Sequence, residues 1–74
     1  MEKLSFRERV RRTLAKMINE KVEKVDLAAI FKYGCFESLT YMYAFRKLLK
    51  DLGLIDDDGR LDFEKAKKFL IEGG

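Results

Sequence analysis

Residues 43–63, which read YAFRKLLKDLGLIDDDGRLDF, constrain the fold of this chain more than any other segment. The segment begins with apolar residues at helical spacing and reaches a glycine of the kind that commonly ends a helix. Residues 54–55 and 60–61 then flank the dipeptide Asp58-Gly59, which is typical of a tight hairpin turn. The pattern therefore predicts a helix, a sharp stop and a minimal hairpin.

The composition is that of one small globular domain. The chain has 74 residues, of which 47% are hydrophobic and 39% charged, so it is too hydrophobic to be disordered. No apolar run is long enough to cross a bilayer, and the N-terminus lacks the apolar stretch of a secretory signal. We therefore expect a cytoplasmic, intracellular protein that does not contact a membrane. The abundance of Lys, Arg and Glu, without His or Trp, also resembles thermophile composition.

Apolar periodicity and capping residues predict four helices in a single domain of residues 1–74. The expected helices span residues 5–21, 26–33, 37–52 and 62–72. Ser5, Asp26 and Asp62 are suitable N-caps, and glycines at positions 34, 53 and 73 are expected to end helices. Residues 23–25 are candidates for a short strand. The predicted fold is all-α, or mainly α with a minimal β-hairpin at residues 54–61.

The apolar faces of these helices are expected to form the core. One face of the first helix carries Phe6, Val10, Leu14, Met17 and Ile18. The apolar side of the third helix carries Tyr41, Met42, Phe45, Leu48, Leu49 and Leu52. The aromatic residues expected in the core are Phe6, Phe31, Phe36, Tyr41, Phe45, Phe63 and Phe69. Tyr33 and Tyr43 are the two exceptions and are expected at the surface.

In this order of elements, the chain resembles a winged helix-turn-helix domain over most of its length. The resemblance implies a four-helix winged-helix-like fold in which residues 37–52 form a recognition helix and residues 54–61 form the wing. Such a helix enters the major groove of double-stranded DNA with its N-terminal residues against the base edges. The residues that this resemblance places at the bases are Ser38, Thr40, Tyr43 and Lys47, and those it places near phosphates are Arg46 and Lys50.

Positive charge is concentrated in the first 24 residues, which hold eight basic and four acidic side chains of a chain whose net charge is +3. Arg7, Arg9, Arg12 and Lys16 of the first helix would attract DNA phosphates regardless of base sequence. The alternative is an ordinary solvated face, on which Glu8 pairs with Arg12 and Lys16 pairs with Glu20.

Two features depart from the pattern of a DNA-binding winged helix and leave a protein partner as the alternative. Residues 56–58 are all Asp, whereas a wing that grips phosphate is normally basic. Leu39, Met42 and Tyr43, near the start of the third helix, are also more apolar than a groove-facing surface needs. Tyr33, Leu39 and Tyr43 are therefore candidates for a protein contact. The alternative function is that of an accessory or assembly subunit, built as a helical bundle without a wing, that docks onto a protein.

The winged-helix resemblance also bears on self-association. Small winged helices often pair through a terminal helix, which makes Leu70 and Ile71 candidates for a homodimer contact.

The sequence gives little support for catalysis or for a cofactor. With no His and one cysteine, Cys35, the chain lacks the usual ligands of a zinc site and an evident base for a nucleophile. Asp56 and Asp58 match positions of a calcium-binding EF-hand loop, but Leu54 and Lys65 stand where two principal ligands belong. The favoured interpretation is a turn whose Asp side chains hold local backbone amides, with weak calcium binding as the alternative. We expect a non-enzymatic domain in which Cys35 is a packing residue.

Overall fold

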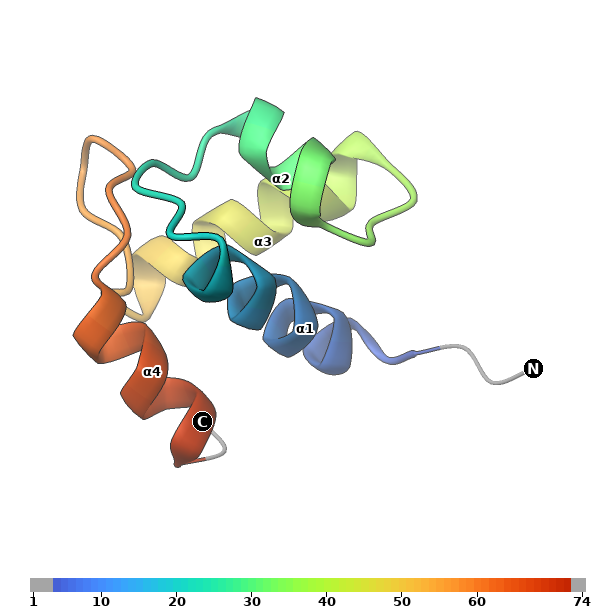
Figure 1. Ribbon diagram of the computed structural model, residues 1–74. Helices are drawn as coiled ribbons and strands as arrows, with labels where there is room; N and C mark the ends of the chain where they lie inside the picture. The colour runs from blue at the N-terminus through green and yellow to red at the C-terminus, as the bar shows by residue number, and fades with distance from the viewer. Residues whose placement is uncertain (1–3, 73–74) are drawn as a thin grey trace.

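The computed structural model describes residues 4–72, which are mainly helical (Figure 1). The helices of this part of the chain are α1 (Phe6–Asn19), α2 (Leu27–Tyr33), α3 (Leu39–Asp51) and α4 (Phe63–Ile71). Helix α1 packs against α2 and α4, and α2 also packs against α3. Each observed helix lies inside its predicted range and is slightly shorter. None of the helices in residues 4–72 combines the length and apolar character that a membrane span requires.

Side-chain caps set the starts of the helices. Ser5, Asp26 and Asp62 are the predicted N-caps of α1, α2 and α4, and each accepts a hydrogen bond of 2.8 to 3.2 Å from the N–H three residues later. Helix α3 starts two residues later than predicted because Ser38 is its N-cap. The Ser38 hydroxyl accepts a 3.4 Å hydrogen bond from the N–H of Tyr41.

The ends of the helices follow the prediction less closely. Helix α1 stops two residues early because Lys21 has a left-handed φ of 55°. Gly53 closes α3 as predicted, with a left-handed φ of 74°. Gly34 follows α2 with an ordinary φ of −81°, so it is not the left-handed stop that was predicted. Glycine is needed there for space, since a Cβ atom would collide with the carbonyl oxygen of Ile30. The predicted stop at Gly73 lies outside the described residues.

The core draws side chains from every helix and from the segments between α1 and α2 and between α3 and α4. Its most buried members are Val10, Leu14, Met17, Val25, Ile30, Phe45, Leu49 and Ala66. Phe45 and Leu49 were predicted to be among them. The Phe45 ring packs on Phe36 with 5.0 Å between ring centroids, and Phe36 packs on Phe6 at 5.9 Å. These aromatic contacts connect α1, α3 and the turn between α2 and α3.

Three predicted core residues are exposed instead. Phe31 is 76% exposed, Tyr41 48% and Leu52 45%. Helix α2 has only seven residues, and Ile30 is its one buried residue. The side chain of Phe31, which follows Ile30 in the helix, therefore points away from the core. Tyr41 covers only the edge of the core, where its ring lies 5.9 Å from that of Phe6. Leu52 follows the last turn of α3 as its C-cap.

Three short segments run side by side between the helices. Two backbone hydrogen bonds of 2.7 and 2.9 Å join residues 23–25 to residues 59–61, and two of 2.8 and 3.1 Å join residues 54–56 to residues 60–62. They create isolated antiparallel bridges between Lys24 and Arg60 and between Ile55 and Leu61. Single bridges are not a continuous two-stranded ladder. The predicted wing is therefore not confirmed, although the hairpin turn forms where the sequence placed it.

Candidate functional site

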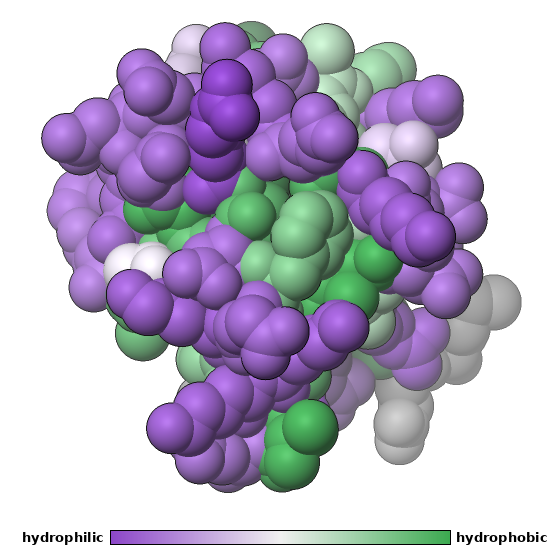
Figure 2. Space-filling model, turned by 60° about the vertical axis from the view of Figure 1, so that its left-hand side comes forward, coloured by the Kyte–Doolittle hydropathy of each residue, from purple (hydrophilic) through white to green (hydrophobic). Residues whose placement is uncertain are grey.

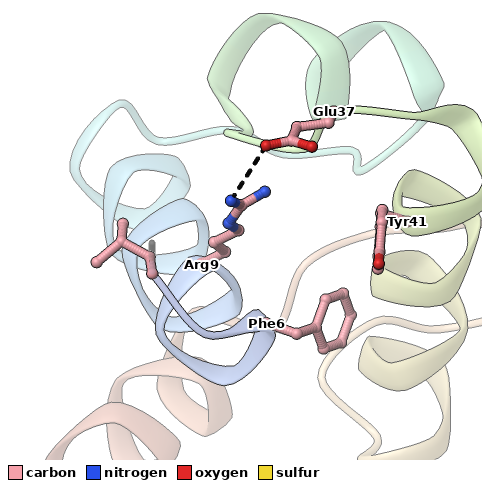
Figure 3. Close-up of a pocket in the computed structure, with 5 residues that line it drawn as sticks. Phe6, Arg9, Glu37 and Tyr41 are labelled. Carbon is pink, nitrogen blue, oxygen red and sulfur yellow. Dashed lines mark hydrogen bonds and ion pairs between the residues drawn. The ribbon is translucent and has the colours of Figure 1, made fainter. Parts of the chain in front are cut away.

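Arg9 of α1, predicted to contact phosphate, is used inside the molecule. Its guanidinium donates a 3.3 Å hydrogen bond to the carbonyl oxygen of Cys35 and pairs with Glu37 at 3.4 Å (Figure 3). Its side chain is 17% exposed. Arg9 therefore ties α1 to the connection between α2 and α3, and its charge is already compensated.

A small cavity lies beside this ion pair. It is lined by Leu4, Phe6, Arg9, Glu37 and Tyr41 and has a volume of about 170 Å³ (Figure 3). Pockets for small molecules usually measure roughly 300–1,000 Å³, so this one is about half the lower limit. The two charged groups of its wall are also bonded to each other. The structure therefore shows the two charged groups of this wall paired with each other beside the rings of Phe6 and Tyr41.

Arg7, Arg12 and Lys16, the other basic residues predicted on α1, are exposed. Arg12 and Lys16 line a second small cavity, of about 160 Å³, whose other lining residues are Leu4, Thr13, Tyr33 and Cys35. The ion pairs expected of a solvated face, between Glu8 and Arg12 and between Lys16 and Glu20, do not form. The structure thus places two cations of α1 beside the C-terminal end of α2.

Cys35 differs from its predicted role as a packing residue, because it is exposed. Its sulfur lies 4.0 Å from the hydroxyl oxygen of Thr13, a buried residue of α1.

Helix α3 turns only some of its predicted DNA contacts outward. Thr40, Tyr43, Lys47 and Lys50 are exposed, and Lys47 pairs with Asp51 at 3.1 Å. The hydroxyl of Ser38 is occupied as the N-cap of α3. The exposed side of α3 therefore carries polar side chains together with the large apolar side chains of Leu39, Tyr41 and Tyr43.

Arg46 of α3 is half-buried and bound within the fold. Its Nε atom donates a 3.2 Å hydrogen bond to the carbonyl oxygen of Val25. A Cβ atom added at Gly59 would lie 3.3 Å from its terminal nitrogen, so the guanidinium also lies against the hairpin turn. Arg46 joins α3 to residues 23–25 and 59–61, and its predicted place near phosphates stays a prediction.

Large apolar side chains are exposed on α2 and at the start of α3. Phe31 is 76% exposed, Leu39 60% and Tyr43 57%. Tyr33 is half-buried, and the ammonium nitrogen of Lys32 lies over its ring, 5.3 Å from the ring centroid. Leu39 and Tyr43 were predicted as protein contacts, whereas Phe31 was predicted to lie in the core. The signal that could have revealed Phe31 is the shortness of α2, which can bury only a narrow stripe.

The end of α4 carries the last predicted contact residues. Leu70 is half-buried and Ile71 is 85% exposed. Figure 2 turns the side of the molecule that carries α4 toward the viewer, and apolar atoms gather there in a patch surrounded by hydrophilic ones.

The acidic turn at residues 56–60 is stabilised by hydrogen bonds from its own backbone to an Asp side chain. One carboxylate oxygen of Asp56 accepts hydrogen bonds of 2.9 Å from the N–H groups of Asp58 and Arg60. Gly59 takes a left-handed φ of 83°, which completes the turn. Within residues 4–72, no three or more Asp, Glu, Cys or His side chains are grouped so that they could hold a metal ion.

We expect millimolar calcium to leave the melting temperature unchanged, because the Asp56 carboxylate is already bonded to backbone amides. A ligand stabilises a fold only as far as its concentration exceeds its dissociation constant. Thermal unfolding followed by circular dichroism, with calcium and with magnesium, checks this expectation. A rise of several degrees that is specific to calcium and absent from Asp58→Ala would contradict it.

Comparison of the chain with protein-family models, curated proteins and solved structures finds no significant match.

Proposed function

We propose that this chain is a non-catalytic binding domain that docks onto a protein partner through exposed apolar side chains of α2 and α3. The observation that carries the proposal is the exposure of Phe31, Leu39 and Tyr43, at 76%, 60% and 57%. Removing large apolar side chains from water is the main favourable contribution to protein association. Tyrosine is also among the residue types that contribute most strongly at binding interfaces.

The internal contacts of Arg9 support the same proposal. Helices α2 and α3 pack against each other, and Arg9 holds the connection between them through Cys35 and Glu37. A surface that is rigid before it binds loses less conformational entropy on binding. The contacts of Arg9 with Cys35 and Glu37 therefore support a role for this residue in holding the apolar surface in place.

Binding to double-stranded DNA by a winged-helix-like domain is the second candidate. The observation in its favour is the outward position of Thr40, Lys47 and Lys50 on α3, where a recognition helix would contact DNA. Arg12 and Lys16 on α1 would add attraction to phosphates. We rank this function second because Arg9 and Arg46 are bound within the fold and the turn at residues 56–58 is acidic.

The test of docking is a pull-down from native cell extract, treated with nuclease, with the immobilised full chain as bait. We expect Leu39→Asp and Tyr43→Ala to lose the partner, since truncating a dominant interface residue costs about 2 kcal/mol or more. Lys16→Glu is the matched control on α1 and should retain the partner. Circular dichroism of each variant establishes that it is folded. Equal retention by all the variants would contradict docking through α2 and α3.

Duplex binding measured by fluorescence anisotropy at increasing salt separates the second candidate from the first. Docking predicts no duplex binding at low salt. DNA binding predicts a log-log slope of about −0.9 per phosphate neutralised, and a loss in Lys16→Glu that is equal for all sequences. That result, together with altered sequence preference in Thr40→Ala, would replace docking by DNA binding as the function.

A further inference from the structure

The cavity beside Arg12 and Lys16, between α1 and the C-terminal end of α2, has positively charged walls. The described residues that line it include these two cations and no carboxylate. They include none of Phe31, Leu39 and Tyr43, so the cavity is separate from the apolar side chains proposed to dock a protein. Its volume of about 160 Å³ lies below the roughly 300 Å³ at which pockets for drug-sized molecules begin, and it therefore suits a small ligand.

The two cations of this cavity repel each other in the free protein. Arg12 and Lys16 stand four residues apart on α1, and like charges at this spacing lie on the same side of a helix and weaken it. Glu8 stands one turn before Arg12 and Glu20 one turn after Lys16, yet neither carboxylate forms an ion pair with these cations within residues 4–72. An anion bound between the two cations would remove their repulsion.

Lys32, in the last turn of α2, adds a third positive charge close to the cavity. Its ammonium nitrogen lies 5.3 Å from the centroid of the Tyr33 ring, and Tyr33 lines the cavity. The carboxylate of Glu37, in the connection between α2 and α3, is already paired with Arg9 at 3.4 Å. The three cations around the cavity therefore have no carboxylate in ion-pair contact within the described part of the chain.

We propose that this cavity binds the phosphate group of a small molecule, either inorganic phosphate or a phosphomonoester. Such a group carries a charge of about −1.5 to −2 at neutral pH, and a phosphomonoester offers three acceptor oxygens. The guanidinium of Arg12 can bind two of these oxygens side by side, and the ammonium of Lys16 can bind the third. Thr13, which is 1% exposed, also lines the cavity, and its hydroxyl is a further donor beside the Cys35 sulfur.

The shape and the charge of the cavity favour this ligand over the backbone of a nucleic acid. A phosphodiester carries about half the charge of a phosphomonoester dianion, and two of its oxygens are linked to the chain on either side. A phosphomonoester is linked on one side only, so its free end can enter a small recess. Because the cations belong to α1 and Tyr33 belongs to α2, a bound phosphate group would also join these two helices.

Isothermal titration calorimetry of the full chain, at an ionic strength held constant with sodium chloride, tests the site with inorganic phosphate and with glycerol phosphate. We expect saturable binding with a dissociation constant of about 1 mM or below. Tighter binding of the phosphate ion would identify free phosphate as the ligand, and tighter binding of the ester would identify a phosphorylated small molecule. Absence of saturation by both ligands up to about 20 mM would overturn the proposal.

Neutral variants test which cations hold the ligand. Arg12→Gln and Lys16→Gln should each raise the dissociation constant about tenfold, because each removes a charge-assisted hydrogen bond. Lys65→Gln, at an exposed position on α4, changes the net charge by the same amount and should leave the dissociation constant unchanged. All three side chains are exposed, so the fold is not at risk. Equal weakening by the three variants would mean diffuse attraction of anions and would exclude a site.

Cys35 reports occupancy of the cavity, because it is the one cysteine of the chain, is exposed and lines the cavity. We expect phosphate to slow alkylation of Cys35 by iodoacetamide in the parent, and to have little effect in Lys16→Gln. If duplex DNA slowed the alkylation and both small ligands did not, the cations would serve a nucleic-acid backbone and the proposal would fail. Leu39→Asp should bind phosphate as the parent does, so loss of the protein partner and loss of this site are separate results.

Discussion

Replacing Phe45 by alanine is expected to lower the free energy of unfolding by about 3–5 kcal/mol. Phe45 is fully buried, and its ring packs on Phe36 at 5.0 Å between centroids. The substitution removes this contact and leaves a cavity that the neighbouring helices can fill only in part. A domain of this length has a total stability of roughly 4–11 kcal/mol, so the variant should be close to unfolded. Urea unfolding followed by far-ultraviolet circular dichroism measures the effect.

Tyr43→Ala is the matched control for Phe45→Ala. It removes an aromatic ring from the same helix, but the ring is 57% exposed. Surface substitutions usually change stability by less than about 0.5 kcal/mol. Similar losses in the two variants would mean that α3 is rotated relative to the core described above.

Replacing Val25 by aspartate should be at least as destabilising, and we expect a loss of about 4 kcal/mol or more. Val25 is fully buried, although it lies in a short segment between α1 and α2. Its backbone N–H donates a 2.7 Å hydrogen bond to Gly59, and its carbonyl oxygen accepts one from Arg46. A carboxylate at this site would be enclosed by apolar side chains. The far-ultraviolet spectrum should therefore show a largely unfolded chain at neutral pH.

Lys24→Asp is the control for Val25→Asp. It introduces an aspartate one residue before Val25, at an exposed position. Successive side chains of an extended segment point to opposite faces, so this carboxylate stays in water. We expect a change within about 1 kcal/mol, as for most surface substitutions. If Lys24→Asp were as harmful as Val25→Asp, the damage would come from the backbone or from charge, and burial of Val25 would not explain it.

Local rules predicted much of this fold because they depend on neighbours in the sequence. Ser5, Asp26 and Asp62 cap helices with an N–H group only three residues away. Phe45 and Leu49 share a face because four residues make about one helical turn. The Asp56 turn closes over four residues in the same way. The end of α1 was less predictable, since no glycine marks the left-handed residue at Lys21.

The candidate surfaces were harder to predict because their polar residues have distant partners. Arg9 bonds to residues 26 and 28 positions away, and Arg46 bonds to one 21 positions away. From sequence, each is one more basic residue on an amphipathic helix. The exposure of Phe31 likewise depends on how much of the short helix α2 the rest of the core can cover.

The amino-acid sequence by itself determined the four helices, the N-caps of α1, α2 and α4, the acidic turn and the central members of the core, since hydrogen bonds and apolar periodicity within a few residues specify them. The tertiary structure alone decided which cations remain available and which apolar side chains stay in water. It bound Arg9 and Arg46 within the fold, left Phe31 exposed and formed the cavity between α1 and the end of α2. Burial and long-range ion pairing arise only when the helices pack against one another. The spacing of residues along the sequence does not show which helix surfaces come into contact.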